Sequence, residues 1–367
     1  MRATYDRTTQ KVGKVATGSY ILPYDYRRER RVSGRRRFFL GVAALYPLLL
    51  VGVSLAQVVA PQREGLFALL QVFALYLFLP LAFLLPFVFM RGATVLRVAL
   101  IACALVFCLR FFPRLDAPVI VPIPGSTQVS VVSWNVRVGG EQAERVGPVL
   151  RSRPAEVVAL IEADWEWLYE DQALAEVYPH RLANPNEAAT GMALLSVYPI
   201  LEHGIVENPR DIWDIPRVMW ARLDLGAGRT VLVVVAHPSP PSTSGRNCAS
   251  LTCYATAKRD MRIEATRDFV EAALRRGDNL LLVGDFNVTE REPAYNELAV
   301  GLRDAHKRVG TGLGNTWGPA SFMSKALPVL RIDYQFSSPN VTPLKTSVDC
   351  TRHGSDHCMV NGTFAIE

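Results

Sequence analysis

Residues 280–287, LLLVGDFN, form the stretch around which the rest of the sequence is organised. The four apolar residues predict a short buried strand, and Gly284 lets the chain break away where that strand ends. Asp285 and Asn287 fall on one side if strand alternation persists. A carboxylate and an amide oxygen placed together suit a hard divalent cation and a phosphate oxygen. A strand followed by an Asx turn explains the same residues more simply, so the rest of the chain must decide.

Charge and hydropathy are unevenly spread over the 367 residues. Residues 1–37 carry a net charge of +8, residues 38–113 carry +3, and residues 114–367 carry −5. The pI of about 9.0 and the positive mean hydropathy therefore belong mainly to the N-terminal third. The mildly acidic remainder argues against a surface that grips polyanions.

Three long apolar runs follow the basic arm 1–37, and each exceeds the roughly 18 residues needed to cross a bilayer. These runs are 38–60, 66–90 and 94–112. We therefore expect three transmembrane helices within residues 38–113, joined by tight turns. A cleavable signal peptide does not fit three such runs.

The basic arm should remain in the cytoplasm, because Lys and Arg flank spans on that side. Three crossings would then place the C-terminal domain in the periplasm or the extracellular space. The third run, with Arg97 and Arg110 near its ends, is the least purely apolar. If it did not cross, the C-terminal domain would lie in the cytoplasm.

A Pro-rich linker, 114–128, leads to a domain at 129–367 that is long enough for one well-buried core. Its pattern mixes strands and helices, which predicts an α+β domain with helices covering sheets. The expected strands are 129–135, 157–162, 192–197, 218–225, 230–237, 280–285, 331–337, 341–348 and 358–364, and the expected helices are 141–152, 165–177 and 256–276.

Polar residues collect where these strands end. They are Asn135, Glu162, His237, Asp285, Asn287, Arg331, Asp333, Asp356 and His357. A Glu that ends a strand is usually solvated, and a lone His more often makes a structural hydrogen bond than catalyses a reaction. Together, however, these are the residue types that metal-assisted phosphoester hydrolysis requires.

The pattern resembles the endonuclease/exonuclease/phosphatase superfamily. The matching pieces occur in the family's order and cover essentially all of 129–367. They are SWNV at 133–136, LIE at 160–162, HP at 237–238, GDFN at 284–287, RIDY at 331–334 and SDH at 355–357. The resemblance implies a four-layer α/β/β/α sandwich, the DNase I-like fold, preceded by the membrane segment.

The resemblance also implies a metal site. Glu162 would be the principal ligand of a Mg²⁺ or Mn²⁺ ion, with Asn135 beside it and Asp356 completing the shell or bracing the site. Such an ion would polarise a phosphate oxygen and offset charge that develops in the transition state.

The remaining matched residues would act on the substrate. His357 would contact the scissile phosphate or act as the base, and Asp333 would orient it. Asp285 would orient the nucleophile, Asn287 would hold a phosphate oxygen, and His237 would donate a second hydrogen bond. Spacing does not decide whether Asp285 or His357 is the base.

Arg137 occupies a position that is often acidic in DNA-acting members of the family, which argues against a second metal site. Arg137 would either contact substrate phosphate or face solvent, and Arg331 is a further candidate for phosphate binding.

The cysteines leave several disulfides open. Cys248 and Cys253 are close enough in sequence to pair, and Cys350 and Cys358 are further candidates. A location outside the cytoplasm would permit these bonds.

We therefore expect a membrane-anchored, metal-dependent phosphodiesterase or phosphomonoesterase that acts outside the cytoplasm. A phospholipid or a small phosphoester is the favoured substrate, DNA or RNA is the alternative, and no obligate protein partner is evident. A non-catalytic membrane protein that binds a phosphorylated ligand would have lost a catalytic residue, and none is missing from the set.

Overall fold

A computed structural model of the chain describes residues 32–139, 141–184, 188–208, 217–245, 248–249, 251–318, 328–351 and 353–367. Most of the basic arm lies outside these residues. Contacts divide the chain into two compact units, one a helical unit and the other containing both sheets. The segment Leu55–Leu77, which includes the end of the first expected span and the start of the second, belongs to the second unit together with Phe111–Glu367.

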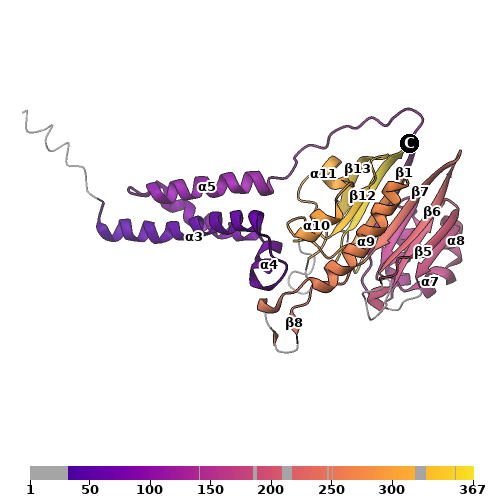
Figure 1. Ribbon diagram of the computed structural model, residues 1–367, viewed down its shortest axis with the longest axis horizontal. Helices are drawn as coiled ribbons and strands as arrows, with labels where there is room; N and C mark the ends of the chain where they lie inside the picture. Colours follow the sequence, from indigo (N-terminus) through magenta and orange to yellow (C-terminus); the bar gives the residue numbers. More distant parts are fainter. Residues whose placement is uncertain are drawn as a thin grey trace, which may run out of the picture. The chain divides into compact units, whose positions relative to one another are not determined.

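The helical unit contains two helices that are long and apolar enough to cross a membrane, α3 (Gly34–Val59) and α5 (Thr94–Phe111) (Figure 1). They coincide with the first and third expected spans. The middle run is not one helix. It divides into α4 (Gly65–Val72) and a 3₁₀ helix, η2 (Tyr76–Phe89), which are bent by 74°.

Proline explains why the middle run departs from a regular α-helix. Pro80 and Pro86 lie inside η2, and each removes a backbone donor and clashes with an α-helical turn. A 3₁₀ helix of 14 residues still extends about 28 Å, close to the roughly 30 Å thickness of a hydrocarbon core. The middle run can therefore span a membrane despite the break.

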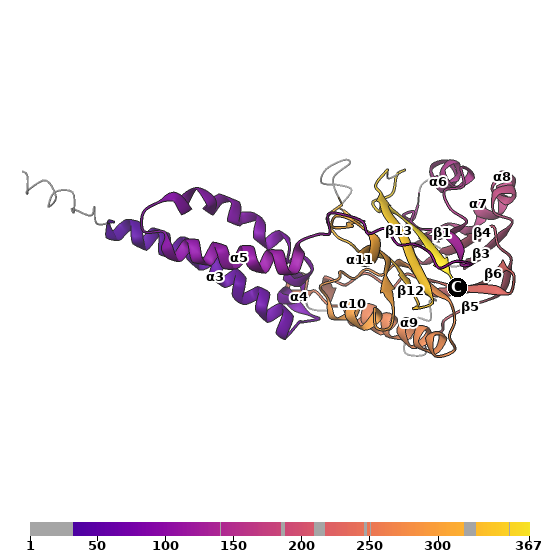
Figure 2. The same ribbon diagram turned by 90° about the horizontal axis from the view of Figure 1, so that it is seen from above.

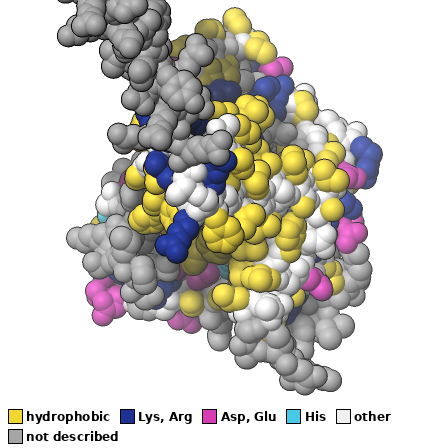
Figure 3. All heavy atoms as spheres, turned by 90° about the vertical axis from the view of Figure 1, so that its left-hand side faces the viewer, with side chains coloured by type: hydrophobic (Ala, Val, Ile, Leu, Met, Phe, Trp, Pro, Cys, Tyr) yellow, Lys and Arg dark blue, Asp and Glu magenta, His cyan; other side chains and the backbone are white. Residues whose placement is uncertain are grey.

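Large apolar side chains on the helical unit are exposed. Figure 3, which shows the molecule from the left-hand side of Figure 1, shows many hydrophobic side chains at the surface. Phe38, Val98, Ile101 and Leu109 are each more than 60% exposed. Outward apolar side chains on long helices suit contact with lipid rather than water.

The second unit contains two mixed six-stranded sheets (Figure 2). The first has the order β13-β14-β1-β2-β4-β3 and the second has the order β11-β12-β10-β7-β6-β5. The first sheet comprises β1 (Thr127–Asn135), β2 (Val157–Ile161), β3 (His180–Asn184), β4 (Met192–Ser196), β13 (Val341–Asp349) and β14 (Met359–Ile366). The second comprises β5 (Ile200–Ile205), β6 (Val218–Gly226), β7 (Arg229–Ala236), β10 (Leu280–Asp285), β11 (Arg303–Asp304) and β12 (Asp333–Ser337). A short hairpin, β8 (Ser244–Gly245) and β9 (Cys248–Ala249), stands apart from both sheets.

Helices cover the outer face of each sheet. Across the first sheet lie α6 (Gln142–Arg151), α7 (Trp165–Glu170) and α8 (Gln172–Val177), which share one buried core with β1, β2 and β4. Across the second lie α9 (Ala257–Arg275) and α10 (Pro293–Leu298), with α11 (Ala305–Val309) following β11. A third core fills the space between the sheets. The expected α/β/β/α sandwich is confirmed.

The elements that sequence patterning missed lie at the edges of the sheets. β3 and β5 are edge strands, and β5 is largely exposed, so neither carries the alternation of a half-buried strand. The expected helix 165–177 is two helices, because Asp171 ends α7 and its side chain accepts a hydrogen bond from the Leu174 N–H to cap α8.

The segment Leu55–Leu77 packs on the rest of the second unit through α4 and the residues before it. Arg63 pairs with Asp260 at 2.7 Å and also with Glu297, and the Gln71 side chain donates to the Arg291 carbonyl at 2.7 Å. The Gly65 N–H donates to the carbonyl of Tyr254 at 2.7 Å. The connection between the first two runs is therefore part of the second unit rather than a simple hairpin turn.

Three of the four candidate cysteines form disulfide bonds. Cys350 and Cys358 form a disulfide, which fixes the segment that carries His357. Cys253 is also disulfide-bonded, and the side chain of Cys248, its expected partner, lies outside the described residues.

Gly284 allows β10 and β7 to approach each other, whereas the sequence indicated only that the chain breaks away at this residue. Its φ is +143°, and a Cβ atom there would lie 2.0 Å from the carbonyl oxygen of Ala236. That oxygen belongs to the backbone and cannot rotate away, so no other residue fits without moving β7.

Gly284→Ala should therefore lower the free energy of unfolding by about 3 kcal/mol, which is about 6–12 °C in the thermal midpoint for a domain of this size. Gly226→Ala is the matched control, because Gly226 also has a positive φ but open space around it. Thermal unfolding of the two variants in detergent should separate them, and equal midpoints would contradict the close approach.

Candidate active site

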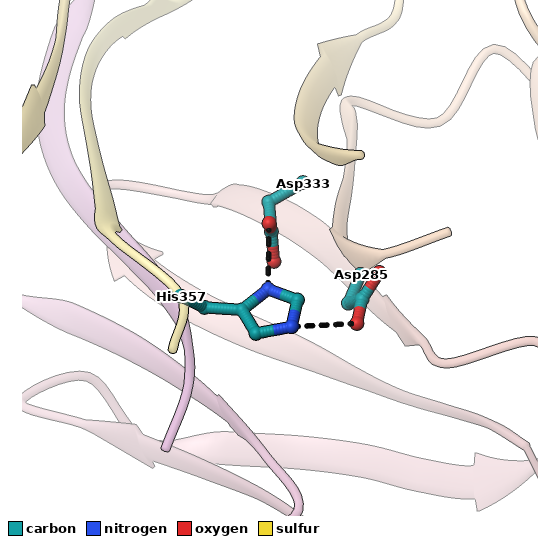
Figure 4. A group of neighbouring side chains, drawn as sticks. All are labelled: Asp285, Asp333 and His357. Carbon is teal, nitrogen blue, oxygen red and sulfur yellow. Dashed lines mark hydrogen bonds and ion pairs between the residues drawn. The ribbon is translucent and has the colours of Figure 1, made fainter. Parts of the chain in front are cut away.

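Side chains from both sheets meet at one end of the sandwich. β1 delivers Asn135 and β2 leads to Glu162, whereas β10 ends at Asp285 and β12 begins at Asp333. His357 precedes β14. Figure 4 shows Asp285, Asp333 and His357 pointing toward one another, and their ligand atoms lie within 4.8 Å of one another. The predicted strand ends therefore converge.

His357 lies between two carboxylates. Its Nδ1 is 2.9 Å from Asp333 Oδ2, and its Nε2 is 3.7 Å from Asp285 Oδ2 (Figure 4). All three side chains are at least 95% buried. Burial alone would lower the pKa of His357, but the charges of Asp333 and Asp285 outweigh it and raise this pKa to about 9. In the absence of metal, His357 is therefore an imidazolium at neutral pH.

Asp285 uses its two oxygens differently. Oδ1 accepts a hydrogen bond from the Asn287 N–H at 3.0 Å, which is an Asx turn. Oδ2 accepts a hydrogen bond from Asn135 Nδ2 at 3.0 Å and faces both histidines. Burial and the neighbouring Asp333 carboxylate raise the pKa of Asp285 to about 7. Asp285 therefore forms the Asx turn with one oxygen and faces the polar site with the other.

Glu162 lies just beyond β2 in a left-handed backbone conformation, with φ 57°. Its Oε1 accepts from Asn135 Nδ2 at 3.1 Å and its Oε2 accepts from the Val138 N–H at 2.9 Å. The side chain is 19% exposed, so solvent reaches it while Asp285 stays buried. A left-handed conformation is costly for Glu, and such strain often marks functional positions.

His237 and Asn287 complete the group. His237 Nε2 lies 3.7 Å from Asp285 Oδ2 and 3.8 Å from Glu162 Oε1. Burial, with the positive charges of Arg217 and His357, lowers the pKa of His237 to about 3, so its imidazole is neutral. Asn287 has φ 52° and its Nδ2 donates to the Pro238 carbonyl at 3.0 Å. Strand alternation therefore does not extend to Asn287, because the strand ends at Asp285.

Three predicted site residues lie outside this cluster of contacts. Asp356 is half-buried and its Oδ2 accepts from Trp317 Nε1 at 3.3 Å. Arg137 is exposed, and its backbone N–H donates to Asn135 Oδ1 at 2.9 Å. The structure does not bring Arg331 into the cluster, because its buried guanidinium pairs with Asp304 and Glu290. A guanidinium held by two carboxylates is not free to bind phosphate.

Sequence reasoning missed three residues that position the site. Gln142 donates to the Glu162 carbonyl at 2.7 Å, and Ser355 donates to the Asn135 carbonyl at 2.6 Å and accepts from the His357 N–H at 3.0 Å. Thr316 accepts from the N–H groups of Ile332 and Asp333 at 3.2 Å. Ser355 belongs to the SDH piece and Thr316 lies in the sequence NTW at 315–317, whereas Gln142 has no signal in the sequence beyond its place at a helix start.

The charges of this site fit a divalent cation. Glu162 Oε1 and Asp285 Oδ2 lie on the same Asn135 Nδ2, at 3.1 and 3.0 Å, and burial together with the Asp333 carboxylate raises the pKa of Asp285. Asp333 Oδ1 is buried without a hydrogen-bond partner among the described residues. Carboxylate and amide oxygens are the ligands that Mg²⁺ and Mn²⁺ prefer.

The fold and the site together define a phosphoester hydrolase. The sequence of residues 132–357, more than half of the chain, matches the profile described as Endonuclease/Exonuclease/phosphatase family. The chain belongs to this family, whose members typically depend on a divalent metal. None of the curated proteins matches the chain in sequence.

Solved structures share the fold. One is a 3′ phosphatase, NExo, from Neisseria bound to a product DNA hairpin, which is 20% identical with a TM-score of 0.51 and covers 64% of this chain and 98% of that one. Another is D. rerio TDP2 with a single-strand DNA product, at 20% identity and a TM-score of 0.51, covering 65% and 99%. A third is a Bacteroides thetaiotaomicron protein of the same family, at 17% and 0.50, covering 66% and 99%. At these identities the likeness shows the fold alone.

Asp333→Asn should lower the pKa of His357, because it removes the carboxylate that contributes most to raising it. The measurement is the imidazole titration by NMR of the metal-free protein with labelled histidine. The folded pKa of about 9 lies above the ordinary 6.5, so this interaction stabilises the fold below pH 6.5 and is lost as the pH rises through 9. The thermal midpoint of the variant should depend less on pH in that window, and an unchanged His357 titration would contradict the pairing.

Proposed function

We propose that this protein is a membrane-anchored, divalent-metal-dependent phosphoesterase that hydrolyses a phosphodiester or phosphomonoester outside the cytoplasm. The observation that carries this proposal is the convergence of Asn135, Glu162, Asp285, Asp333 and His357 from four strands and one loop. We take the roles of the individual residues as part of the proposal.

Glu162 and Asn135 would hold the ion, and Asp356, which contacts Trp317, would brace the site. Bound Mg²⁺ or Mn²⁺ would polarise a phosphate oxygen and offset charge developing in the transition state. Glu162 suits this role because it is the most accessible carboxylate of the set and its second oxygen is fixed by the Val138 N–H.

Asp285 is the proposed base. Asp333 lies 2.9 Å from Nδ1 of His357 and favours its imidazolium form, so His357 would donate a hydrogen bond to a phosphate oxygen, which leaves Asp285 as the acceptor of the proton. Asp285 accepts the proton of the attacking water as the new P–O bond forms and the bond to the leaving oxygen breaks. Neutral His237 and the Asn287 amide would donate hydrogen bonds to the remaining phosphate oxygens.

The contacts of Leu55–Leu77 support three crossings of the membrane. Arg63 and Gln71 contact the catalytic domain, so the loop after α3 and this domain share one side of the membrane. The chain between them must then cross an even number of times, which η2 and α5 do together. Ala93, at the turn between η2 and α5, packs with Leu40 near the start of α3, as this arrangement requires.

The arginines before α3 would keep that end in the cytoplasm. The catalytic domain would then lie outside, where the disulfide of Cys350 and Cys358 is expected to persist. This agreement between charge, contacts and disulfide supports the proposed location.

Glu162→Gln should reduce Mg²⁺-dependent hydrolysis of a chromogenic phosphodiester by roughly 10²–10³-fold or more, the scale of losing one transition-state contact to developing charge. Glu166→Gln is the control, because Glu166 is exposed on α7 and is remote from the cluster. Chelation by EDTA should abolish the wild-type rate, and added Mg²⁺ or Mn²⁺ should restore it. Undiminished turnover of Glu162→Gln would sink the assignment of the metal site.

A reporter that is active only outside the cytoplasm should be active when fused after Glu367 and inactive when fused after Arg91, and a reporter that is active only inside should show the reverse. Alkaline phosphatase and a fluorescent protein, expressed in a bacterium, give these opposite readouts. A cytoplasmic signal from the Glu367 fusion would overturn the proposed location.

A further inference from the structure

A cavity of about 210 Å³ adjoins the active site, and one of its walls comes from the membrane segment. Leu69 and Val72 of α4, with Phe73 after it, line this wall. Leu330, Ile332 and Asn287 of the proposed phosphate site also line the cavity. All of these residues belong to the same compact unit.

Two residues that line the cavity, Trp317 and Asn287, also belong to the surroundings of the active site. The indole of Trp317 lines the cavity and its Nε1 donates to Asp356, while its backbone forms a bridge with His357. A molecule whose phosphate contacts Asn287 and His357 can therefore extend directly into the cavity. Its volume is below the roughly 300–1,000 Å³ of sites that enclose a whole drug-sized ligand, so it suits one part of a substrate.

Three of the polar residues that line the cavity, Tyr254, Thr289 and Glu292, are already bonded to one another. Glu292 accepts hydrogen bonds from the Tyr254 hydroxyl at 3.2 Å, from Arg259 at 2.7 Å and from the Thr289 N–H at 2.7 Å. Thr289 Oγ1 also bonds Glu292, at 3.1 Å. Reading the edge of a nucleobase requires donors and acceptors that are free to bond it, and those of Tyr254, Thr289 and Glu292 are engaged.

The position of α4 between two apolar helices of the chain also favours a lipid substrate. α4 follows directly from the first apolar helix, and the chain continues from Phe73 into the apolar η2. The cavity therefore lies on the part of the catalytic unit that is tied to the membrane at both ends.

We infer that this cavity binds the apolar part of an amphiphilic phosphoester, and that the substrate of the enzyme is a membrane lipid whose phosphate is cleaved at Asp285 and His357. The inference rests on the proposed function, and it adds the substrate class and a specificity-determining role for α4. Leu69 would favour long-chain esters over small soluble ones.

The test compares three phosphodiesters that share a 4-nitrophenol leaving group and carry a hexadecyl, a methyl or a 5′-thymidine group. The full-length protein in nanodiscs should prefer the hexadecyl ester, and Leu69→Trp, which fills the cavity, should reduce the hexadecyl-to-methyl ratio of kcat/KM by about tenfold or more, as expected for lost methylene contacts. Leu66→Trp is the matched control, because Leu66 is on the same helix but 48% exposed and outside the cavity. It should leave the ratio unchanged.

The outcomes separate this inference from the proposed function. If the wild type hydrolyses the methyl ester with Mg²⁺ and Glu162, but Leu69→Trp keeps the hexadecyl preference, the cavity assignment is overturned and the phosphoesterase stands. If Leu69→Trp selectively impairs the thymidine ester, the cavity binds a nucleobase and the lipid assignment is wrong. If the wild type hydrolyses neither these esters nor the monoester 4-nitrophenyl phosphate with either metal, the proposed function fails.

Loss of all activity in Leu69→Trp would point to misfolding, and a second measurement then decides. A hexadecyl phosphodiester with a photoreactive group at the chain end should label the wild-type peptide that contains Leu330 and Ile332, which is distant in sequence from the membrane helices. Absence of label in that peptide, with labelling confined to α3, η2 and α5, would overturn the inference.

Discussion

The site depends on Asp285, a buried carboxylate whose negative charge the surrounding protein does not fully offset. Asp285 is 1% exposed, and the carboxylate of Asp333 lies in the same small cluster. Burying two acidic groups together is unfavourable unless positive charge accompanies them. His357 supplies part of this charge from between them, and the geometry of the neighbouring oxygens is suited to a cation that would supply the rest.

The backbone holds these side chains by the same device on both sheets. Asp285 and Asn135 each use one side-chain oxygen to accept the N–H two residues later, at 3.0 Å and 2.9 Å. The other side-chain atom is left facing the cluster, where Asn135 joins Glu162 to Asp285. The turn fixes the rotamer, so the simplest explanation of the LLLVGDFN stretch is also the means by which it builds a site.

The membrane segment contributes more than an anchor. Arg63 and Gln71 bind the catalytic domain, and α4 forms a wall of the cavity beside Asn287. The break in the middle apolar run makes this possible, because α4 turns away from η2 by 74°. A continuous helix over 66–90 would have carried Leu69 into the bilayer instead of against the enzyme.

The sequence by itself determined the family, the apolar runs and most of the residues at the strand ends, because these follow from local patterns and ordered motifs. It marked Gly284 as the point where the chain breaks away from the strand, but the close approach to β7 came from the structure. Sequence spacing did not exclude Arg331, whose partners Asp304 and Glu290 are distant along the chain. Gln142, the disulfide of Cys350 and Cys358 and the cavity at α4 were decided only by tertiary structure. Each depends on contacts between segments far apart or on a bend in the backbone, which residue types and periodicity do not specify.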